Sequence, residues 1–350
     1  VKTEGWNIVP LSQLRGQSHD STLTTSLFSS PAWLDALSAE YGFEFSVLYH
    51  GDNVFEGLYF VSIDDLAGKR VISLPFSDYV LSSLAPPLLA QGLNYLRLQF
   101  PAHSIIYKSA DMREFGKLLG SNWSSTRQAV YHRVSIDDEE IMWNRLSESF
   151  QRGVKKAKKS NVTVNHLLNE HSLEDFYKLY CALRLEKFHS IPQPFSFFKK
   201  ILDRFSLDNS ASILVASVEQ KPVAVLFVLF YGEVAYYKFG ASDGLYLNHR
   251  PNNLLFWELL CSLRERGVTE LDLGLSGGGD SYAGLRKFKE SMGGNERAIE
   301  YFTCRPESPN NNSAEEFKAH LSSLTTAIVN AKLDSEQVSS LSKLIYRYFA

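Results

Sequence analysis

The stretch HRPNNLLFWELLCSLRERG, residues 249–267, predicts a helix that is packed on nearly all sides. Large apolar residues surround the expected helix axis, and Glu258, Ser262 and Glu265 leave a narrow polar stripe. The apolar residues are Leu254, Leu255, Phe256, Trp257, Leu259, Leu260 and Leu263. A strand-like run, TELDLGL (269–275), follows directly. A buried helix that leads into a strand is typical of an α/β fold, in which helices cover a sheet.

The composition describes a folded globular protein. Its 350 residues exceed one ordinary core, so two domains of roughly 150 residues each are expected. The hydrophobic share of 44% and the aromatic share of 13% are those of a well-packed chain. The formal net charge of −3 carries no basic excess, so nucleic-acid binding would require a local basic patch.

The cysteines and the apolar runs predict the compartment. Cys181, Cys261 and Cys304 are widely spaced and odd in number, which fits neither a disulfide framework nor a metal-binding pattern. We therefore expect reduced thiols, no metal and no tightly bound cofactor. The longest apolar runs fall short of the ~18 residues of a bilayer span, and no signal peptide opens the chain. These patterns predict a cytoplasmic protein without an integral membrane segment.

Both halves of the chain share an order of predicted elements, which favours an internal duplication. In the first half we expect strands at 6–12, 45–63, 70–76, 95–101 and 131–136, and helices at 29–42, 82–93 and 111–120. In the second half we expect strands at 162–168, 211–219, 221–232, 234–242, 269–275 and 297–304, and helices at 172–188, 195–205, 252–266 and 284–294. The predicted domains are 1–136, a connecting basic helix at 137–160, a catalytic domain at 161–305, and a linker with a helical tail at 306–350.

Four stretches carry a resemblance to a known family. They are SFQRGVKKAKKSNVTV (149–164), YYKFGASD (236–243), NLLFWELLCSLRERGVTELDLGLSGG (253–278) and GLRKFKESMGG (284–294). In this order they resemble the FemABX-type aminoacyl transferases, which are non-ribosomal peptidyl transferases, and the wider group of Fem-like acyltransferases associated with cell-envelope polysaccharides. The resemblance implies tandem GNAT-like domains with mixed α/β sheets, and an acyl carrier bound where two neighbouring strands splay apart.

The turn Arg250-Pro251-Asn252-Asn253 precedes the buried helix and leaves two interpretations open. Asn252 or Asn253 can cap a purely structural helix. Alternatively, the free amides at the helix start bind the anionic end of a substrate, with Arg250 as a helper. GNAT enzymes that bind coenzyme A carry a glycine-rich loop at the equivalent turn. Its glycines are missing here and Pro251 removes a donor, which argues against the usual coenzyme A cradle.

A basic cluster lies near the middle of the chain. Arg152, Lys155, Lys156 and Lys159 follow i, i+3, i+4, i+7 spacing and would share one helix face. They are either a solvated helix end or a diphosphate site. The resemblance implies nucleotide- or lipid-diphosphate-linked acceptors and favours the second interpretation, with a tRNA backbone as another target.

Further candidates follow the last strands of the second half. The resemblance implies that Lys289 lies at the active cleft, where it would stabilise an oxyanion, with Lys287 nearby for binding; surface lysines flanking a buried Phe288 are the alternative. Gly277 and Gly278 permit close backbone approach to a ligand, or simply form a turn.

Strand alternation supplies the remaining candidates of the second half. It places Tyr236 and Lys238 on one strand face and Tyr237 and Phe239 on the other, and we favour the Tyr236/Lys238 face as functional. Asp272 could act as a base or as a structural partner of Arg286.

Two residues of the first half, Asp78 and Tyr79, lie in the run PFSDY (75–79), which also fits the wider Fem-like group. We expect them to bind substrate. No Walker loop or His-x-x-x-His pair occurs, so nucleotide binding by a Walker loop and metal binding by such a pair are not indicated.

The predicted function is transfer of an activated acyl or aminoacyl group onto an amine of a cell-envelope acceptor, either a peptidoglycan precursor or a polysaccharide. The amine would attack the carbonyl directly in a ternary complex, in the cleft of the second domain, with the acceptor reaching across from the first. Lys289, Tyr236 and Asp272 are the catalytic candidates. The donor is aminoacyl-tRNA or acyl-CoA, and a lipid-linked acceptor would bring peripheral membrane contact. The alternatives are an acyl-CoA-dependent N-acyltransferase of a small metabolite, and a non-catalytic binding protein with this fold.

Overall fold

The computed structural model describes residues 5–14, 26–52, 54, 56–112, 114–306 and 312–350. The chain divides into two compact units. Unit 1 comprises Val1–Ala129, Ala298–Ser322 and Arg347–Ala350, and unit 2 comprises Val130–Arg297 and Ser323–Tyr346. The mixed α/β fold that the sequence predicts is confirmed, including a helical C-terminal region made of α10 (Asn312–Asn330) and α11 (Ser335–Ile345). Residues 307–311 of the predicted linker lie outside the described residues.

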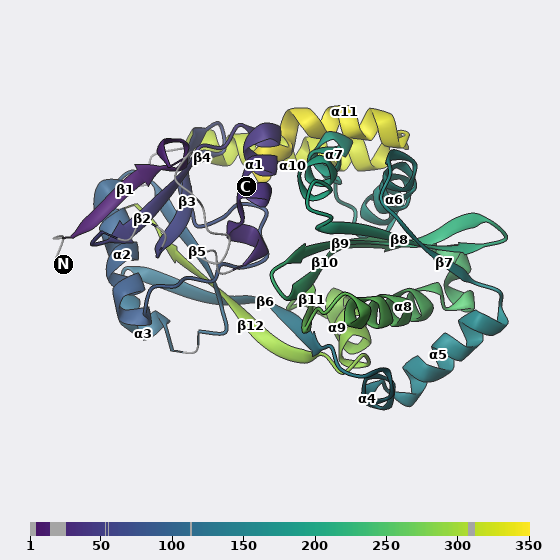
Figure 1. The fold of residues 1–350 in the computed structure, drawn as a ribbon. Helices are drawn as coiled ribbons and strands as arrows, with labels where there is room; N and C mark the ends of the chain where they lie inside the picture. Colours follow the sequence, from purple (N-terminus) through teal and green to yellow (C-terminus); the bar gives the residue numbers. More distant parts are fainter. Residues whose placement is uncertain (1–4, 15–25, 53, 55, 113, 307–311) are drawn as a thin grey trace. The chain divides into compact units, whose positions relative to one another are not determined.

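Unit 1 is built on a sheet in the order β1-β2-β3-β4-β5-β12 (Figure 1). Its strands are β1 (Trp6–Pro10), β2 (Phe45–His50), β3 (Gly57–Asp65), β4 (Gly68–Ile72), β5 (Ser104–Ala110) and the end of β12 (Asn295–Cys304). Its helices include α1 (Pro31–Tyr41), α2 (Pro86–Gln99) and α3 (Gly116–Leu119). Local sequence determines α1: Ser30 accepts a hydrogen bond from the Trp33 amide at 3.3 Å, and Gly42 ends the helix with a φ of 69°.

The strand predicted at 95–101 is wrong, because α2 continues to Gln99. Leu89, Leu93 and Leu96 are buried at helical spacing, and a proline at the first turn is compatible with a helix. The strand of this region is β5 instead, which the sequence analysis missed.

The single helix predicted at 137–160 is two helices. α4 (Glu139–Arg145) ends at Leu146, whose backbone is extended with a ψ of 140°. α5 (Glu148–Lys159) then begins anew, and Ser147 caps it by accepting from the Phe150 amide at 3.2 Å. Serine followed by an acidic residue is a start signal for a helix, and it separates α5 from α4.

Unit 2 holds a sheet in the order β6-β11-β10-β9-β8-β7. Its strands are β6 (Trp123–Ser135, which begins in unit 1), β7 (Thr163–Leu167), β8 (Ala211–Val218), β9 (Lys221–Tyr231), β10 (Val234–Ser242) and β11 (Glu270–Gly277). Helices α6 (Glu170–Ala182) and α7 (Phe195–Phe205) cover one face of the sheet, and α11 packs on both of them (Figure 1). α8 (Pro251–Glu265) covers the other face, with α5 packed on α8 and α9 (Ala283–Glu290) beside it. Asn169 caps α6 in a capping box that places Ser172 at the third helical position.

The tail helix α11 is part of unit 2. Ser342 donates to the Pro192 carbonyl at 2.5 Å, and Ser339 accepts from the Phe195 amide at 2.8 Å. Both contacts hold the start of α7. The last helix of the chain therefore fastens a segment that lies far earlier in the sequence.

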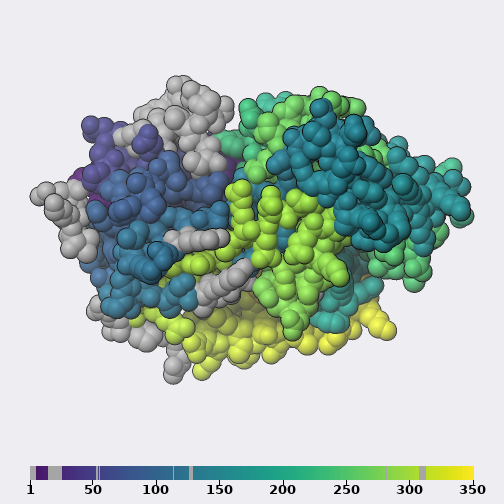
Figure 2. Space-filling model, turned by 90° about the horizontal axis from the view of Figure 1, so that it is seen from below, coloured from purple at the N-terminus to yellow at the C-terminus, as the bar shows by residue number. Residues whose placement is uncertain are grey.

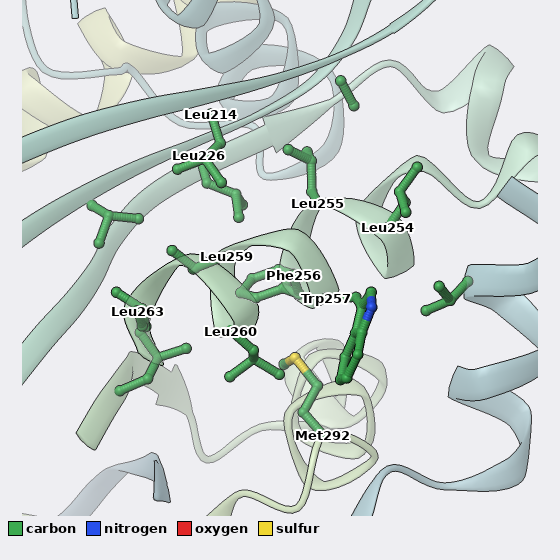
Figure 3. Close-up of a cluster of buried hydrophobic side chains, with 14 of the residues drawn as sticks. Leu214, Leu226, Leu254, Leu255, Phe256, Trp257, Leu259, Leu260, Leu263 and Met292 are labelled. Atoms are coloured by element: carbon green, nitrogen blue, oxygen red, sulfur yellow. The ribbon is translucent and has the colours of Figure 1, made fainter. Parts of the chain in front are cut away.

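The helix α8 is the centre of the unit 2 core, as its sequence predicts. Figure 3 shows its side chains reaching Leu214 of β8 and Leu226 of β9 on one side and Met292 on the other. Trp257 also meets Trp143 of α4 edge to face, at 4.8 Å between ring centroids. Each such buried side chain contributes about 2 kcal/mol of hydrophobic free energy, so α8 is the main link between the sheet and the helices beneath it.

The parallel strands β10 and β11 part soon after they meet. Among the described residues they pair at three positions, Val234 with Glu270, Ala235 with Leu271 and Tyr236 with Asp272. β10 then continues to Ser242 and β11 to Gly277 without further shared register. The expectation that two neighbouring strands splay apart in the second half is confirmed.

In the part of the chain that the structure describes, no helix combines the length and the apolar character that crossing a lipid bilayer requires.

Close packing of α5 on α8 yields a stability prediction. A Cβ at Gly153 would lie 2.6 Å from the Cγ of Asn253, so Gly153→Ala should lower the free energy of unfolding by about 1–3 kcal/mol. Gly284→Ala, also in a helix, meets nothing within 4 Å and should leave stability equal or higher. Urea unfolding measures both variants. Equal midpoints for them would contradict the packing described for Gly153.

Candidate functional site

A cavity of about 830 Å³ lies within unit 2, lined by α5, α9 and the start of α8. Four cationic residues line it, namely Arg152, Lys156, Arg250 and Lys287, and Glu290 is the acidic residue in the lining. Figure 2 shows the surfaces of α4–α5 (blue-teal) and α9 (yellow-green) next to one another on one face of this unit. A cavity with this excess of positive charge suits an anionic ligand.

The cavity is lined by segments that follow the two parting strands in the sequence, namely the start of α8 and α9. α8 follows β10 after a short 3₁₀ turn (Gly244–His249), and α9 follows β11. Asn252 donates through Nδ2 to the Ser242 Oγ at 3.2 Å, which joins the start of α8 to the last residue of β10. In open α/β sheets, ligands bind outside the carboxyl ends of the strands, where neighbouring strands diverge.

The cavity walls are fixed to each other. The Ser147 amide donates to the Ser291 carbonyl at 2.9 Å, which ties the start of α5 to the end of α9. Phe288 contacts both Phe150 and Phe256, each at 5.6 Å between ring centroids. These aromatic contacts pack α9 against α5 and α8, the helices that carry the cationic residues of the cavity.

The start of α8 differs from the expectation that Asn252 or Asn253 caps the helix. Arg250 is the cap residue, in a left-handed conformation with a φ of 60°, and it makes no side-chain cap bond. Pro251 takes the first helical position, so the two asparagines lie at the second and third. All four residues line the cavity, and the start of a helix carries partial positive charge.

The predicted basic face of α5 divides in the structure. Arg152 and Lys156, four residues apart, line the cavity. Lys155 lies over the Trp143 ring, with its Nζ 5.9 Å from the ring centroid, and Lys159 is exposed away from the cavity lining. Arg152 also pairs with Glu148 at 3.1 Å, but both side chains are exposed, so this ion pair contributes little.

Lys289 lies in the interior, beside the parting strands. Its side chain is 2% exposed, and its Nζ donates to the Gly274 carbonyl at 2.7 Å and to the Leu275 carbonyl at 3.2 Å. Asp272 is equally buried, accepts from the Gly274 amide at 2.7 Å and lies 3.6 Å from the Nε of Arg133. These residues hold β11 just past its last pair with β10, and they lie outside the cavity lining.

A β-bulge overturns the expected alternation along β10. The register with β9 shifts between Tyr237 and Phe239, so the extra residue Lys238 reverses the alternation. Tyr237 packs on Phe256 of α8 and Phe239 on aromatic residues of α6 and α7, so these two residues face opposite sides and do not share the predicted face. Tyr236 is buried, and Lys238 lies over the Phe239 ring.

The remaining candidates lie elsewhere. Tyr79 is fully buried in unit 1 against Phe28, and Asp78 is half-buried in the same unit. Gly277 ends β11, where a Cβ would lie 2.6 Å from the Tyr282 ring, and Gly278 is exposed. None of these residues lines the cavity of unit 2.

A buried histidine lies beside Lys289. His132, Glu290 and Glu296 each offer one ligand atom within 4.8 Å of the others, a nitrogen and oxygen set that divalent transition metals accept. However, the charges of Lys289 and Arg286 act on His132, and they would repel a further cation, so this group is a poor metal site.

Several cavity residues were not predicted from the sequence, among them Ser147, Ser149, Leu247 and Ser291. Ser149 shares a helix face with Arg152 and Lys156 at i, i+3, i+7 spacing, which was a usable signal. No local pattern indicated that the end of α9 would meet the start of α5.

Comparison with known proteins finds a family match within the second unit. Residues 144–289 match the model of the acetyltransferase (GNAT) domain. This stretch of the chain is therefore similar to a GNAT domain. The match includes the parting strands and, apart from Glu290 and Ser291, the residues that line the cavity. No curated protein matches the chain.

Solved structures extend this fold to most of the chain. A crystal structure of FemX is similar over 82% of this chain and 95% of its own, with a TM-score of 0.61 and 14% identity. The C-terminal domain of a protein assigned as a lysylphosphatidylglycerol synthetase from Agrobacterium fabrum covers 83% and 91%, with a TM-score of 0.53 and 12% identity. A tandem GNAT protein from the clavulanic acid pathway covers 87% and 100%, with a TM-score of 0.50 and 13% identity. The chain has the fold of the Fem-like, tandem GNAT acyltransferases.

The contacts of Lys289 predict a structural effect. Lys289→Met leaves two buried carbonyls without this donor and should lower the free energy of unfolding by about 1–3 kcal/mol. Lys287→Met, on the exposed side of the GNAT domain's α9, is the control and should cost less than about 0.5 kcal/mol. Chemical denaturation compares the two. If both variants match the parent protein, the Lys289 contacts do not stabilise β11.

Burial of His132 predicts how stability depends on pH. Desolvation, reinforced by the charge of Lys289, lowers the pKa of His132 from 6.5 to about 4. Between these values the unfolded chain binds more protons than the folded one, so stability falls as pH falls, by on the order of 3 kcal/mol across the window. His132→Phe should reduce this loss between about pH 7 and about pH 4.5. An unchanged difference between the two pH values, measured by urea unfolding, would show that His132 titrates normally.

Proposed function

We propose that this protein transfers an activated acyl or aminoacyl group to an amine of a cell-envelope acceptor, and that the cavity of unit 2 binds a phosphate-bearing part of a substrate. The observation that carries the proposal is the set of four cationic residues and a helix start at the open end of β10 and β11 in a GNAT domain. Fold similarity to FemX and to a lysylphosphatidylglycerol synthetase, a protein named for an aminoacylated anionic lipid, supports an envelope acceptor.

The reaction would be a direct acyl transfer. The acceptor nitrogen attacks the carbonyl carbon, a C–N bond forms, the C–O or C–S bond to the carrier breaks, and the amine proton passes to solvent or to the departing carrier. Catalysis would come mainly from holding both substrates in contact and from donors that face the developing oxyanion. Backbone amides near the bulge at Lys238 are our candidates for these donors, because β10 has left β11 at this point.

Lys289, Tyr236 and Asp272 have a positioning role in this proposal. Tyr236 and Asp272 form the last pair between the strands, and Lys289 binds the carbonyls that follow. Together they would determine where the strands part and hence where the reactive carbonyl enters. The oxyanion role of Lys289 that the resemblance implies would require its ammonium to leave these carbonyls.

The donor decides between two versions of this function. The start of α8 has Pro251 and asparagines in place of a glycine-rich loop, which favours an aminoacyl-tRNA ester over coenzyme A. An acyl-CoA-dependent transfer to a small metabolite is the second candidate, and the tandem GNAT similarity over 87% of this chain favours it. Thermal unfolding with acetyl-CoA and with charged tRNA separates them, because a ligand that binds the native state raises the midpoint.

The cavity cations yield a functional prediction. The double variant Arg152→Glu/Lys156→Glu should weaken binding of a nucleotide-diphosphate sugar, or of the donor that raises the midpoint, by about 100-fold, since a charge-assisted contact to phosphate contributes roughly 1.5–3 kcal/mol. Lys155→Glu/Lys159→Glu changes the same helix by the same charge but lies outside the cavity lining, so it should change binding less than about threefold. Titration calorimetry of both variants is the measurement. Equal losses would mean that general charge, and not the cavity, binds the ligand.

A further inference from the structure

Two exposed leucines lie on the turn that leads into the cavity. Leu245 is 85% exposed and Leu247 is 48% exposed, both on the 3₁₀ turn Gly244–His249 between β10 and α8. Leu247 also lines the cavity. Single exposed apolar residues are ordinary, but two on one short turn that borders a cationic cavity form an amphipathic surface.

Contacts of Asp243 and Tyr246 fix the conformation of this turn, and its two leucines remain exposed. Asp243 accepts from the Leu245 amide at 2.9 Å and pairs with Lys221 at 3.3 Å. The Lys221 ammonium lies 4.6 Å from the centroid of the Tyr246 ring, and Tyr246 packs against the unit 2 core. Tyr246 therefore anchors the turn between the two leucines, and the leucines remain outside the core.

The charge beside the leucines is positive. Arg250 follows the turn directly, and Lys287, Arg152 and Lys156 lie around the same cavity. Apolar side chains flanked by lysine and arginine match a bilayer surface, where the apolar groups enter the acyl region and the cations meet anionic headgroups. A nucleic acid would use the cations but gains little from exposed leucine.

We propose that the turn Gly244–His249 docks this protein on an anionic lipid surface, with Leu245 and Leu247 inserted and Arg250 at the headgroups. This rests on the proposed function in one respect, namely that a lipid-linked acceptor would enter the cavity directly from the membrane. Each inserted leucine adds roughly tenfold to partitioning, and the cations make the binding depend on anionic lipid and on salt.

The test is co-sedimentation of the full chain with vesicles of phosphatidylcholine, with and without phosphatidylglycerol. We expect binding to the phosphatidylglycerol vesicles, at least a tenfold loss for Leu245→Ser/Leu247→Ser, and a loss for Arg250→Glu. Leu207→Ser, which alters a leucine that is 80% exposed outside the turn, is the control and should bind like the parent protein.

Three results would overturn the proposal. They are no binding by the parent protein, equal binding by the leucine double variant, and binding to tRNA that is as sensitive to the two leucines as vesicle binding is. Transfer activity on a water-soluble acceptor is measured separately. Vesicle binding that depends on the leucines, without any transfer activity, would refute the proposed function and leave the docking surface standing.

Discussion

The parting of β10 and β11 after three paired residues is the constraint on which the rest of unit 2 depends. Separated strands leave backbone groups that must find other partners in the interior. The Asp272 carboxylate accepts from the Gly274 amide, and the Lys289 ammonium donates to the Gly274 and Leu275 carbonyls. Two buried side chains therefore bind backbone groups that a neighbouring strand would otherwise bind. On β10 the register with β9 shifts at Lys238, and such a bulge bends a strand and increases its twist.

The sequence predicted those parts of the fold that depend on local periodicity. The apolar pattern from Leu254 to Leu263 correctly indicated a helix packed on almost all sides, and Ser30 with Gly42 marked both ends of α1. The sequence did not predict features in which a single residue changes the backbone geometry of an element. Lys238 as a bulge residue is indistinguishable from an ordinary strand residue, since the shift depends on the pairing with β9. Ser147 divides 137–160 into two helices, although serine also occurs within helices.

The cavity was predictable in part for the same reason. Arg152 and Lys156 share a helix face by spacing alone, and both line the cavity. That Lys155 would lie over Trp143 depends on how α4 packs, which spacing does not report. The family resemblance indicated Lys289, and no sequence pattern indicated Leu247. Burial of a lysine among carbonyls and exposure of a leucine both depend on tertiary structure. The structures compared above are less than 15% identical to this chain, so they establish the fold and do not identify the substrate.

The contacts between α11 and the start of α7 have a consequence for folding during synthesis. Residues 130–297 of unit 2 leave the ribosome well before residues 323–346, yet Ser339 and Ser342 hold the start of α7. The aromatic layer of α6 and α7 must therefore wait until α11 has been synthesised before these contacts can form. During that interval α6 and α7 lack the cover that α11 provides, and transiently exposed apolar surface of this kind is prone to aggregation.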